Sequence, residues 1–129
     1  MSTNLRTPLS SIQGLGSAKT GTTHFLHQRM TAVVLIPLAF WFTIAALAQV
    51  GASQGSVASF LGNPVNAVLM FLFLSTALYH MTIGVQVVIE DYVHGEGMKL
   101  LLVILNRLAA FAIGASVGLA LVRLTVAGH

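Results

Sequence analysis

Three long apolar runs constrain what this chain can fold into. They lie at about residues 30–50, 65–89 and 100–126, and each has the roughly 20 residues that a helix needs to cross a bilayer. In lipid the backbone must satisfy its own hydrogen bonds, so runs of this length form helices. Of the 129 residues, 56% are hydrophobic and 7% are charged, and the mean hydropathy is +0.88. The predicted fold class is therefore an all-α membrane protein with three transmembrane helices.

The domain organisation follows from the same runs. We expect residues 1–29 to be an N-terminal segment on the cytoplasmic or matrix side, and residues 30–129 to be a three-helix transmembrane anchor. Within these parts, residues 1–23 are expected to be extended or partly disordered, and residues 51–64 to be a short loop. There is no cysteine, which excludes disulfides and Cys-ligated zinc or iron–sulfur clusters from this chain.

Basic residues predict the orientation of the three spans. With three crossings, the N-terminus and the second connection share one side, which holds Arg6, Lys19, Arg29 and Lys99, whereas the other side holds Arg123. Cytoplasmic segments of membrane proteins carry an excess of Lys and Arg. The N-terminus is therefore expected to face the cytoplasm, and the formal net charge of +3 reports topology and not nucleic-acid binding.

A histidine inside the second run is the first candidate for chemistry. On a helix, His80, Gly84, Val87 and Asp91 fall within about 60° of one face. Ionisable groups inside a bilayer tend to be functional, imidazole is a common haem ligand, and Gly84 leaves space for a flat macrocycle. The other histidines are expected near the membrane surfaces, so a second haem ligand would come from another subunit. From spacing alone, haem ligation and an interhelical hydrogen bond both remain open for His80.

The second run ends in Glu90, Asp91 and Tyr92. Acids at a helix C-terminus are unfavourable for the macrodipole, so their presence suggests some compensation or use. Glu90 is interpreted as a solvated helix end. The Tyr92 phenol is either an interfacial belt tyrosine or a hydrogen-bond donor to a quinone carbonyl. The predicted orientation places Arg29 at the same membrane surface as Asp91 and Tyr92.

The third run carries a deep cation and a row of small residues. Arg107 lies roughly 12 Å along the helix from Lys99, too deep for simple snorkelling, and requires an anion. A lipid phosphate, a haem propionate and an acid on a partner are the alternatives. Ala110, Gly114 and Gly118 have the spacing that lets helix backbones approach closely, and a helix contact within this chain is the favoured interpretation.

Two sequence motifs carry a family resemblance. HMTIGVQVVIEDYV resembles the H-x₃-G-x₆-DY signature of the hydrophobic membrane anchor subunit of succinate dehydrogenase (respiratory complex II), the anchor designated D. HFLHQRMTAVVL is similar to that family's pattern of an arginine followed two residues on by a threonine. The likeness covers about residues 24–100 and the three-span layout. The histidine motif and the SPH-type element of the sister anchor, designated C, are absent from the sequence.

The resemblance implies a set of residue roles. His80 matches the ligand that this anchor gives to a b-type haem iron, shared with a histidine of the sister anchor, and Gly84 lies beside it. Tyr92 matches a tyrosine that hydrogen-bonds ubiquinone, with Asp91 as its neighbour in that site. Arg29 matches an arginine near the haem propionates and the quinone pocket. The flavoprotein subunit and the iron–sulfur subunit of the complex are the further partners implied.

The resemblance implies that this chain is a membrane anchor and forms part of a hetero-oligomeric helix bundle. The complex that it anchors serves the tricarboxylic acid cycle and electron transport. Electrons from succinate reach ubiquinone through clusters of another subunit, so this chain does not perform the dehydrogenase chemistry itself. The expected location is the bacterial inner membrane, ahead of the mitochondrial inner membrane. A haem-free structural or assembly anchor and a fumarate reductase anchor are the alternatives. His24 stands where the family often has an acid, which departs from the pattern near a proton path.

Overall fold

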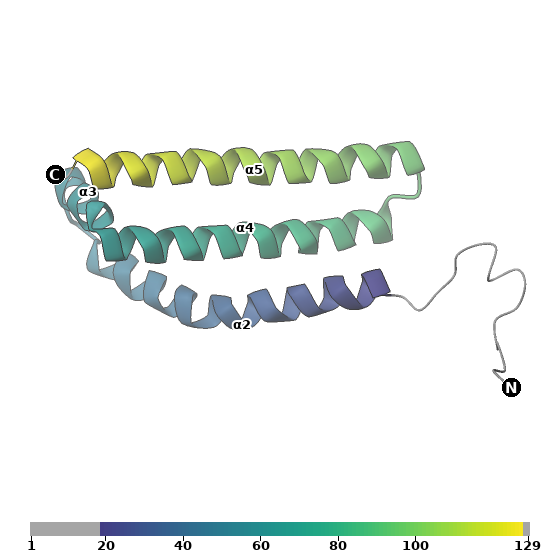
Figure 1. Cartoon of the computed structure of the whole chain (residues 1–129), viewed down its shortest axis with the longest axis horizontal. Coiled ribbons are helices and arrows are strands. Elements are labelled where there is room, and N and C mark those ends of the chain that lie inside the picture. The colour runs from purple at the N-terminus through teal and green to yellow at the C-terminus, as the bar shows by residue number, and fades with distance from the viewer. Residues whose placement is uncertain (1–18, 128–129) are drawn as a thin grey trace, which may run out of the picture.

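The computed structural model describes residues 19–127, and every element in that part of the chain is a helix. The helices are α2 (Lys19–Ala48), α3 (Gln54–Gly62), α4 (Pro64–Tyr92) and α5 (Glu96–Ala127). Figure 1 shows α2, α4 and α5 running alongside one another, with the start of α2, the end of α4 and the start of α5 at one end of the molecule. These three helices are long and apolar enough to cross a membrane. The prediction of an all-α membrane fold with three such helices is confirmed.

The first helix begins earlier than the sequence suggested. The expectation of an extended segment over residues 1–23 is wrong for residues 19–23, which already belong to α2; residues 1–18 and 128–129 lie outside the described part. A single glycine inside a helix costs only about 1 kcal/mol, so Gly21 does not end it. α2 therefore carries one additional polar stretch ahead of its apolar run.

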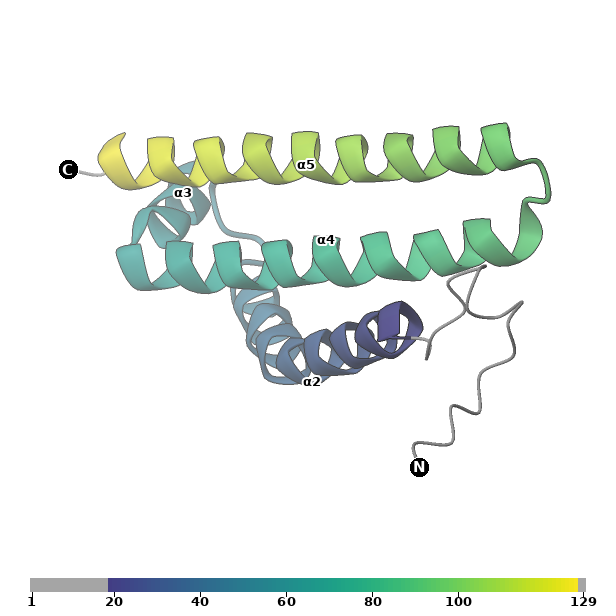
Figure 2. The same ribbon diagram turned by 45° about the vertical axis from the view of Figure 1, so that its right-hand side comes forward.

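α2 is bent part-way along its length, as both views of the ribbon show (Figures 1 and 2). Pro37 is the proline inside this helix. Proline has no N–H to give to the preceding turn and its ring clashes with the carbonyl four residues back, which bends a helix. The predicted effect of Pro37 agrees with the observed shape.

A short helix replaces the expected loop over residues 51–64. α2 ends in a turn at Gly51, whose φ of +79° favours glycine. Ser53 then caps α3, because its Oγ accepts the Ser56 N–H at 3.2 Å. The prediction of a loop over 51–64 is therefore wrong for Gln54–Gly62. Glycine, serine and proline suggested a loop, but here the serine starts a helix.

The two remaining connections are tight. Asn63 ends α3 and caps α4, with its Oδ1 accepting the Val65 N–H at 3.0 Å, and Pro64 occupies the first turn, where no N–H is needed. Between α4 and α5 only residues 93–95 are non-helical. Glu96 lies in the first turn of α5, where an acid complements the helix dipole. This short link forces α5 to run back along α4.

The helices pack in a simple order. α4 contacts α2, α3 and α5, and α3 also contacts α5, whereas α2 and α5 do not pack on each other. The predicted contact of the small-residue stripe within the chain is confirmed: a Cβ on Gly114 would lie 3.5 Å from Leu78, and one on Gly118 would lie 3.5 Å from Phe71. No large side chain among residues 21–127 is fully buried. Most of the apolar surface therefore faces lipid or other chains.

Gly62 provides a test of the closest helix contact. A Cβ at this position would lie 2.9 Å from the backbone oxygen of Leu124, which cannot move as a side chain can. We predict that Gly62→Ala pushes α3 away from α5 and destabilises the bundle by about 1–3 kcal/mol, the usual range for overpacking. The measurement is loss of helical circular dichroism as denaturing detergent is added to the purified protein in mild micelles.

The matched control is Gly55→Ala in the same helix, where an added Cβ meets only the Ser53 hydroxyl, at 4.0 Å. It should be neutral or slightly stabilising, since alanine favours helix. Equal behaviour of the two variants would contradict the close approach of α3 and α5.

Candidate functional site

His80 lies in the middle stretch of α4 and both of its ring nitrogens have partners on α2. Its Nδ1 is 2.9 Å from the Thr31 hydroxyl oxygen, and its Nε2 is 3.3 Å from the Gln28 side-chain nitrogen. Both contacts are part-buried between the two helices. The interhelical hydrogen bond that the sequence left open is therefore present in the structure.

The helix face that carries His80 is turned toward α2. Phe73, on the same stripe, stacks on Phe42 of α2 with ring centroids 4.6 Å apart. Gly84 also faces α2, because a Cβ there would lie 3.6 Å from the Gln28 side-chain nitrogen. The gap beside His80 that the sequence predicted thus holds the Gln28 amide.

A second polar contact lies beside the first. His27 Nδ1 and the Tyr79 hydroxyl are 2.9 Å apart, and their rings are tilted against each other at 6.1 Å. The expectation that His27 lies near the membrane surface is wrong, since its partner is the immediate neighbour of His80. His27 itself remains exposed, on the part of α2 that lies beside Tyr79.

Arg29 is also deeper than predicted. Its neighbours Gln28 and Thr31 both contact His80, and Tyr92 lies twelve residues further along α4, roughly 18 Å away along the helix. The expectation that Arg29 shares a surface with Asp91 and Tyr92 is therefore wrong. The Arg29 guanidinium carbon lies 5.1 Å from the centre of the Phe25 ring, so the cation is stabilised by an aromatic face one turn nearer the start of α2.

Gln86 connects the deep arginine of α5 to an acid of α4. Arg107 donates to the Gln86 side-chain oxygen at 3.1 Å, and the Gln86 side-chain nitrogen donates to Glu90 at 2.7 Å. Gln86 is 9% exposed and is the buried polar residue of the described chain. Glu90 is exposed near the end of α4, which agrees with its interpretation as a solvated helix end, and it also accepts this hydrogen bond. The sequence analysis did not single out Gln86. The signal that could have found it is an amide side chain four residues before an acid, the spacing at which the two contact each other on a helix.

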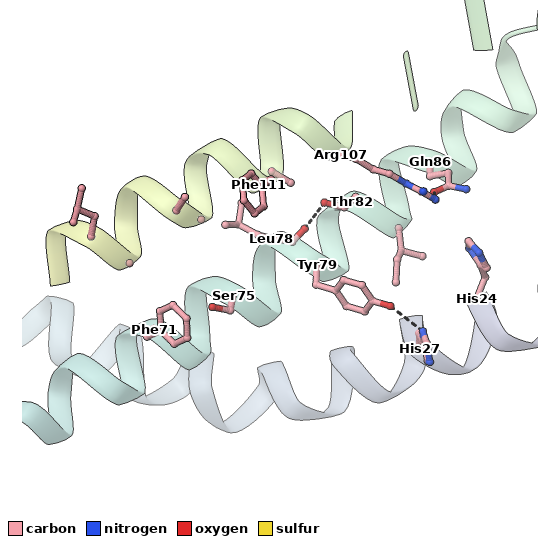
Figure 3. Close-up of a pocket in the computed structure, with 16 residues that line it drawn as sticks. His24, His27, Phe71, Ser75, Leu78, Tyr79, Thr82, Gln86, Arg107 and Phe111 are labelled. Atoms are coloured by element: carbon pink, nitrogen blue, oxygen red, sulfur yellow. Dashed lines mark hydrogen bonds between the residues drawn. The ribbon is translucent and has the colours of Figure 1, made fainter. Parts of the chain in front are cut away.

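An open apolar groove of about 820 Å³ runs along the α4–α5 pair (Figure 3). Its polar end is formed by His24, His27, Gln86 and Arg107. Figure 3 shows the Tyr79 hydroxyl reaching across to His27 at this end. None of the predicted site residues lines this groove.

A smaller cavity of about 450 Å³ lies between α2 and α4 and is lined in part by Gln28, which contacts His80. His24, Gln28, Gln86 and Glu90 supply its polar lining. It thus joins the acid at the end of α4 to the amide that contacts His80. His24, the residue that departs from the family pattern, lines both spaces.

Asp91 and Tyr92 form the exposed end of α4. Tyr92 is 77% exposed and Asp91 is also open to the surroundings. Both are available to a partner chain or a lipid-soluble molecule at this end of the bundle. Within residues 19–127 no group of three or more His, Cys, Asp or Glu side chains comes together as a metal site, so His80 stands as a single candidate ligand.

Comparison with known proteins gives the family of this chain. The family model described as "Succinate dehydrogenase/Fumarate reductase transmembrane subunit" matches residues 3–114. The chain belongs to this family. All five predicted site residues lie within the matched range, as does Arg107, and the resemblance drawn from the sequence motifs is confirmed. No solved structure matches the chain.

Individual relatives in this family are similar in sequence to this chain over most of their length. The protein of Rickettsia bellii named succinate dehydrogenase hydrophobic membrane anchor subunit is 32% identical over 108 residues, which is 84% of this chain and 86% of the relative. The protein of the same name from Paracoccus denitrificans is 31% identical over 118 residues, or 92% and 91% of the two chains. In Reclinomonas americana, the succinate dehydrogenase membrane anchor subunit is 32% identical over 98 residues, or 74% and 82%.

The Gln86 bridge of this family member yields a stability prediction. Gln86→Met keeps the length of the side chain but removes both hydrogen bonds of the Gln86 amide. Arg107 and Glu90 then lose the partner that they share. A hydrogen bond to a charged group contributes about 1.5–3 kcal/mol, so the variant should lose at least that much stability. The measurement is the same detergent titration of helical signal.

Arg107→Met, alone and combined with Gln86→Met, completes a double-mutant cycle. If the bridge exists, the combined loss is smaller than the sum of the single losses, because the second change removes an interaction that is already gone. Strictly additive losses would mean that Gln86 and Arg107 do not interact.

Proposed function

We propose that this chain is the hydrophobic membrane anchor of a succinate:ubiquinone oxidoreductase in a bacterial inner membrane, with its N-terminus in the cytoplasm. The names of its relatives and its three spanning helices support this assignment. The near absence of a buried core supports assembly with other chains. Those partners are the sister anchor subunit, the iron–sulfur subunit and the flavoprotein subunit. The chain binds and positions cofactor and quinone and leaves succinate oxidation to the other subunits.

His80 carries the haem part of the proposal. It is the ionisable residue in the middle stretch of a spanning helix, and its Nε2 has only a long 3.3 Å contact with Gln28. The other polar atom of the Gln28 amide, Oε1, is buried and has no hydrogen-bond partner within residues 19–127, so this side chain is poorly satisfied there. An imidazole whose Nε2 is held only by a long contact would be able to bind the iron of a haem b. When bound, such a haem accepts and returns single electrons.

Other residues of the chain fit supporting roles around that group. Gly84 has no side chain that would compete for the space next to His80. The Arg29 guanidinium lies against Phe25, one turn nearer the start of α2 than Gln28, and supplies a positive charge of the kind that propionates require. Neither residue depends on the exposed end of α4, so haem binding and quinone binding use separate parts of this chain.

The quinone part of the proposal rests on Tyr92 and Asp91. The phenol is exposed at the end of α4, where an apolar ring can enter from the bilayer and its carbonyl can meet a donor. A donor that binds the carbonyl more strongly as it gains negative charge accelerates reduction. Asp91 is the adjacent carboxylate and can orient the phenol or hold a proton.

A second candidate function is a haem-free structural or assembly anchor. The observation that favours it is that both nitrogens of His80 already have partners within the chain. The fumarate reductase anchor is a further alternative, because the family description covers both enzymes. The relatives named above are all succinate dehydrogenase subunits, which favours the succinate direction.

His80→Ala tests the haem assignment. The purified complex should lose its low-spin b-type absorption spectrum, since the ligand on this chain is removed. Oxidation of succinate with an artificial acceptor should persist, because that chemistry belongs to other subunits in this proposal. His27→Ala is the control. It removes a nearby imidazole whose Nδ1 already contacts the Tyr79 hydroxyl, so the haem spectrum should survive. An unchanged spectrum in His80→Ala would show that His80 is not the haem ligand, whereas a wild-type complex with no haem spectrum would support the haem-free anchor.

Tyr92→Phe tests the quinone assignment. The ring remains and one donor is lost, so turnover with ubiquinone should fall about 10- to 150-fold, the equivalent of about 1.5–3 kcal/mol. Haem content and assembly should not change. The assay is succinate–ubiquinone reductase activity of membranes, normalised to bound flavin.

The other tyrosine of the chain supplies the control for that assay. Tyr79→Phe loses its bond to His27 but lies far from the end of α4, so it should keep the wild-type apparent KM for quinone. Wild-type turnover and KM in Tyr92→Phe would instead assign Tyr92 to the aromatic belt and the quinone site to other subunits.

A further inference from the structure

Thr31 makes an unusual set of contacts for a threonine in a spanning helix. Its hydroxyl oxygen lies 2.8 Å from the backbone oxygen of His27 and 3.1 Å from that of Gln28. Both neighbours are acceptors only, so the single hydroxyl hydrogen must point to them. The sequence singled out Thr31 only as part of a motif and suggested no role for it.

The direction of that hydrogen fixes the state of His80. With its hydrogen given to α2, the Thr31 oxygen can only accept at its third contact, the 2.9 Å approach to His80 Nδ1. Nδ1 must therefore carry the hydrogen of the neutral ring, and Nε2 carries the lone pair. The Gln28 contact agrees with this assignment, because the amide nitrogen that faces Nε2 can only donate.

We propose that Thr31 is a positioning residue that holds His80 in the Nδ1-protonated tautomer, with Nε2 as the nitrogen available to a metal. This inference rests on the proposed haem ligation and adds the device that prepares the ligand. A hydroxyl that donates to carbonyls is polarised and becomes a better acceptor. By accepting from Nδ1–H, it makes the imidazole a more basic ligand and fixes the plane of the ring.

Gln28 has a complementary place in this arrangement. Its side-chain nitrogen makes a long hydrogen bond of 3.3 Å to Nε2 of His80, the nitrogen proposed to bind the metal. Its own Oε1 lacks a hydrogen-bond partner among the described residues. Displacing Gln28 from His80 therefore gives up a weak contact, whereas displacing Thr31 would break a short one. The two partners of the imidazole ring therefore differ in strength. Thr31 at Nδ1 stays in place when a metal binds, whereas Gln28 at Nε2 is displaced.

The test uses the purified complex carrying Thr31→Val, which keeps the shape of the side chain and removes the acceptor, and Thr31→Ala, which removes it without adding bulk. A less basic ligand stabilises ferric haem less, so both variants should raise the midpoint potential of the haem in a redox titration. They should also weaken haem retention about 10- to 100-fold, measured as the rate of transfer to an apo-haem protein. Thr31→Ser should restore both properties.

Thr43→Val is the matched control. Thr43 lies on the same helix and makes the same backward bond, to the Ala39 oxygen at 2.8 Å, but is not bonded to a histidine. It should leave potential and retention unchanged. If Thr31→Val and Thr31→Ala behave as Thr43→Val does, Thr31 does not set the state of the ligand.

His80→Ala, measured in parallel, separates this inference from the proposed function. Loss of the haem spectrum in His80→Ala with unchanged potentials in both Thr31 variants would leave the haem assignment standing and remove the role of Thr31. Retention of the spectrum in His80→Ala would overturn both, since the tautomer matters only if His80 is the ligand.

Discussion

Helices in a bilayer gain little from burying apolar surface against each other, because lipid is equally apolar, and so a few polar contacts determine how they pair. In this chain the polar contacts that join α2 and α5 to α4 lie along residues 79–86 of α4. α2 reaches α4 through His27, Gln28 and Thr31, and α5 reaches α4 through Asn106, which donates to the Thr82 backbone oxygen at 2.9 Å, and Arg107. Elsewhere Asn66 of α4 donates to the Phe60 backbone oxygen of α3, Phe42 of α2 stacks on Phe73, and glycines of α5 pack on α4. The candidate site is therefore also the place where the bundle is fastened.

How far the sequence could predict this arrangement depends on the kind of feature. Length and hydropathy were sufficient for the three spans, because the bilayer sets them. The face shared by His80 and Gly84 was likewise predictable, because helical geometry is fixed. What lies opposite that face was not. It depends on how α2 is rotated and how deeply it begins, and a helix that starts at Lys19 brings Gln28 and Thr31 to the histidine.

The same limit explains the missed residues. Gln86 is an ordinary amide in sequence, and its importance appears only when α5 turns Arg107 toward it. The anion that Arg107 required was predicted outside the chain or at a cofactor, but Glu90 approaches it through one intervening side chain. The helix over Gln54–Gly62 was missed because its turn-forming residues act as caps. Their partners are backbone groups, which the sequence does not distinguish.

The bond between Thr31 and His80 joins residues 49 positions apart on helices that lie on either side of α3 in the chain. The α4–α5 hairpin is closed by a three-residue link, and its two helices contact each other directly. Gln28 and Thr31, the side chains that contact the two ring nitrogens of His80, both come from α2. The proton position of this imidazole is therefore a property of the packed α2–α4 pair and not of the helix that carries the histidine.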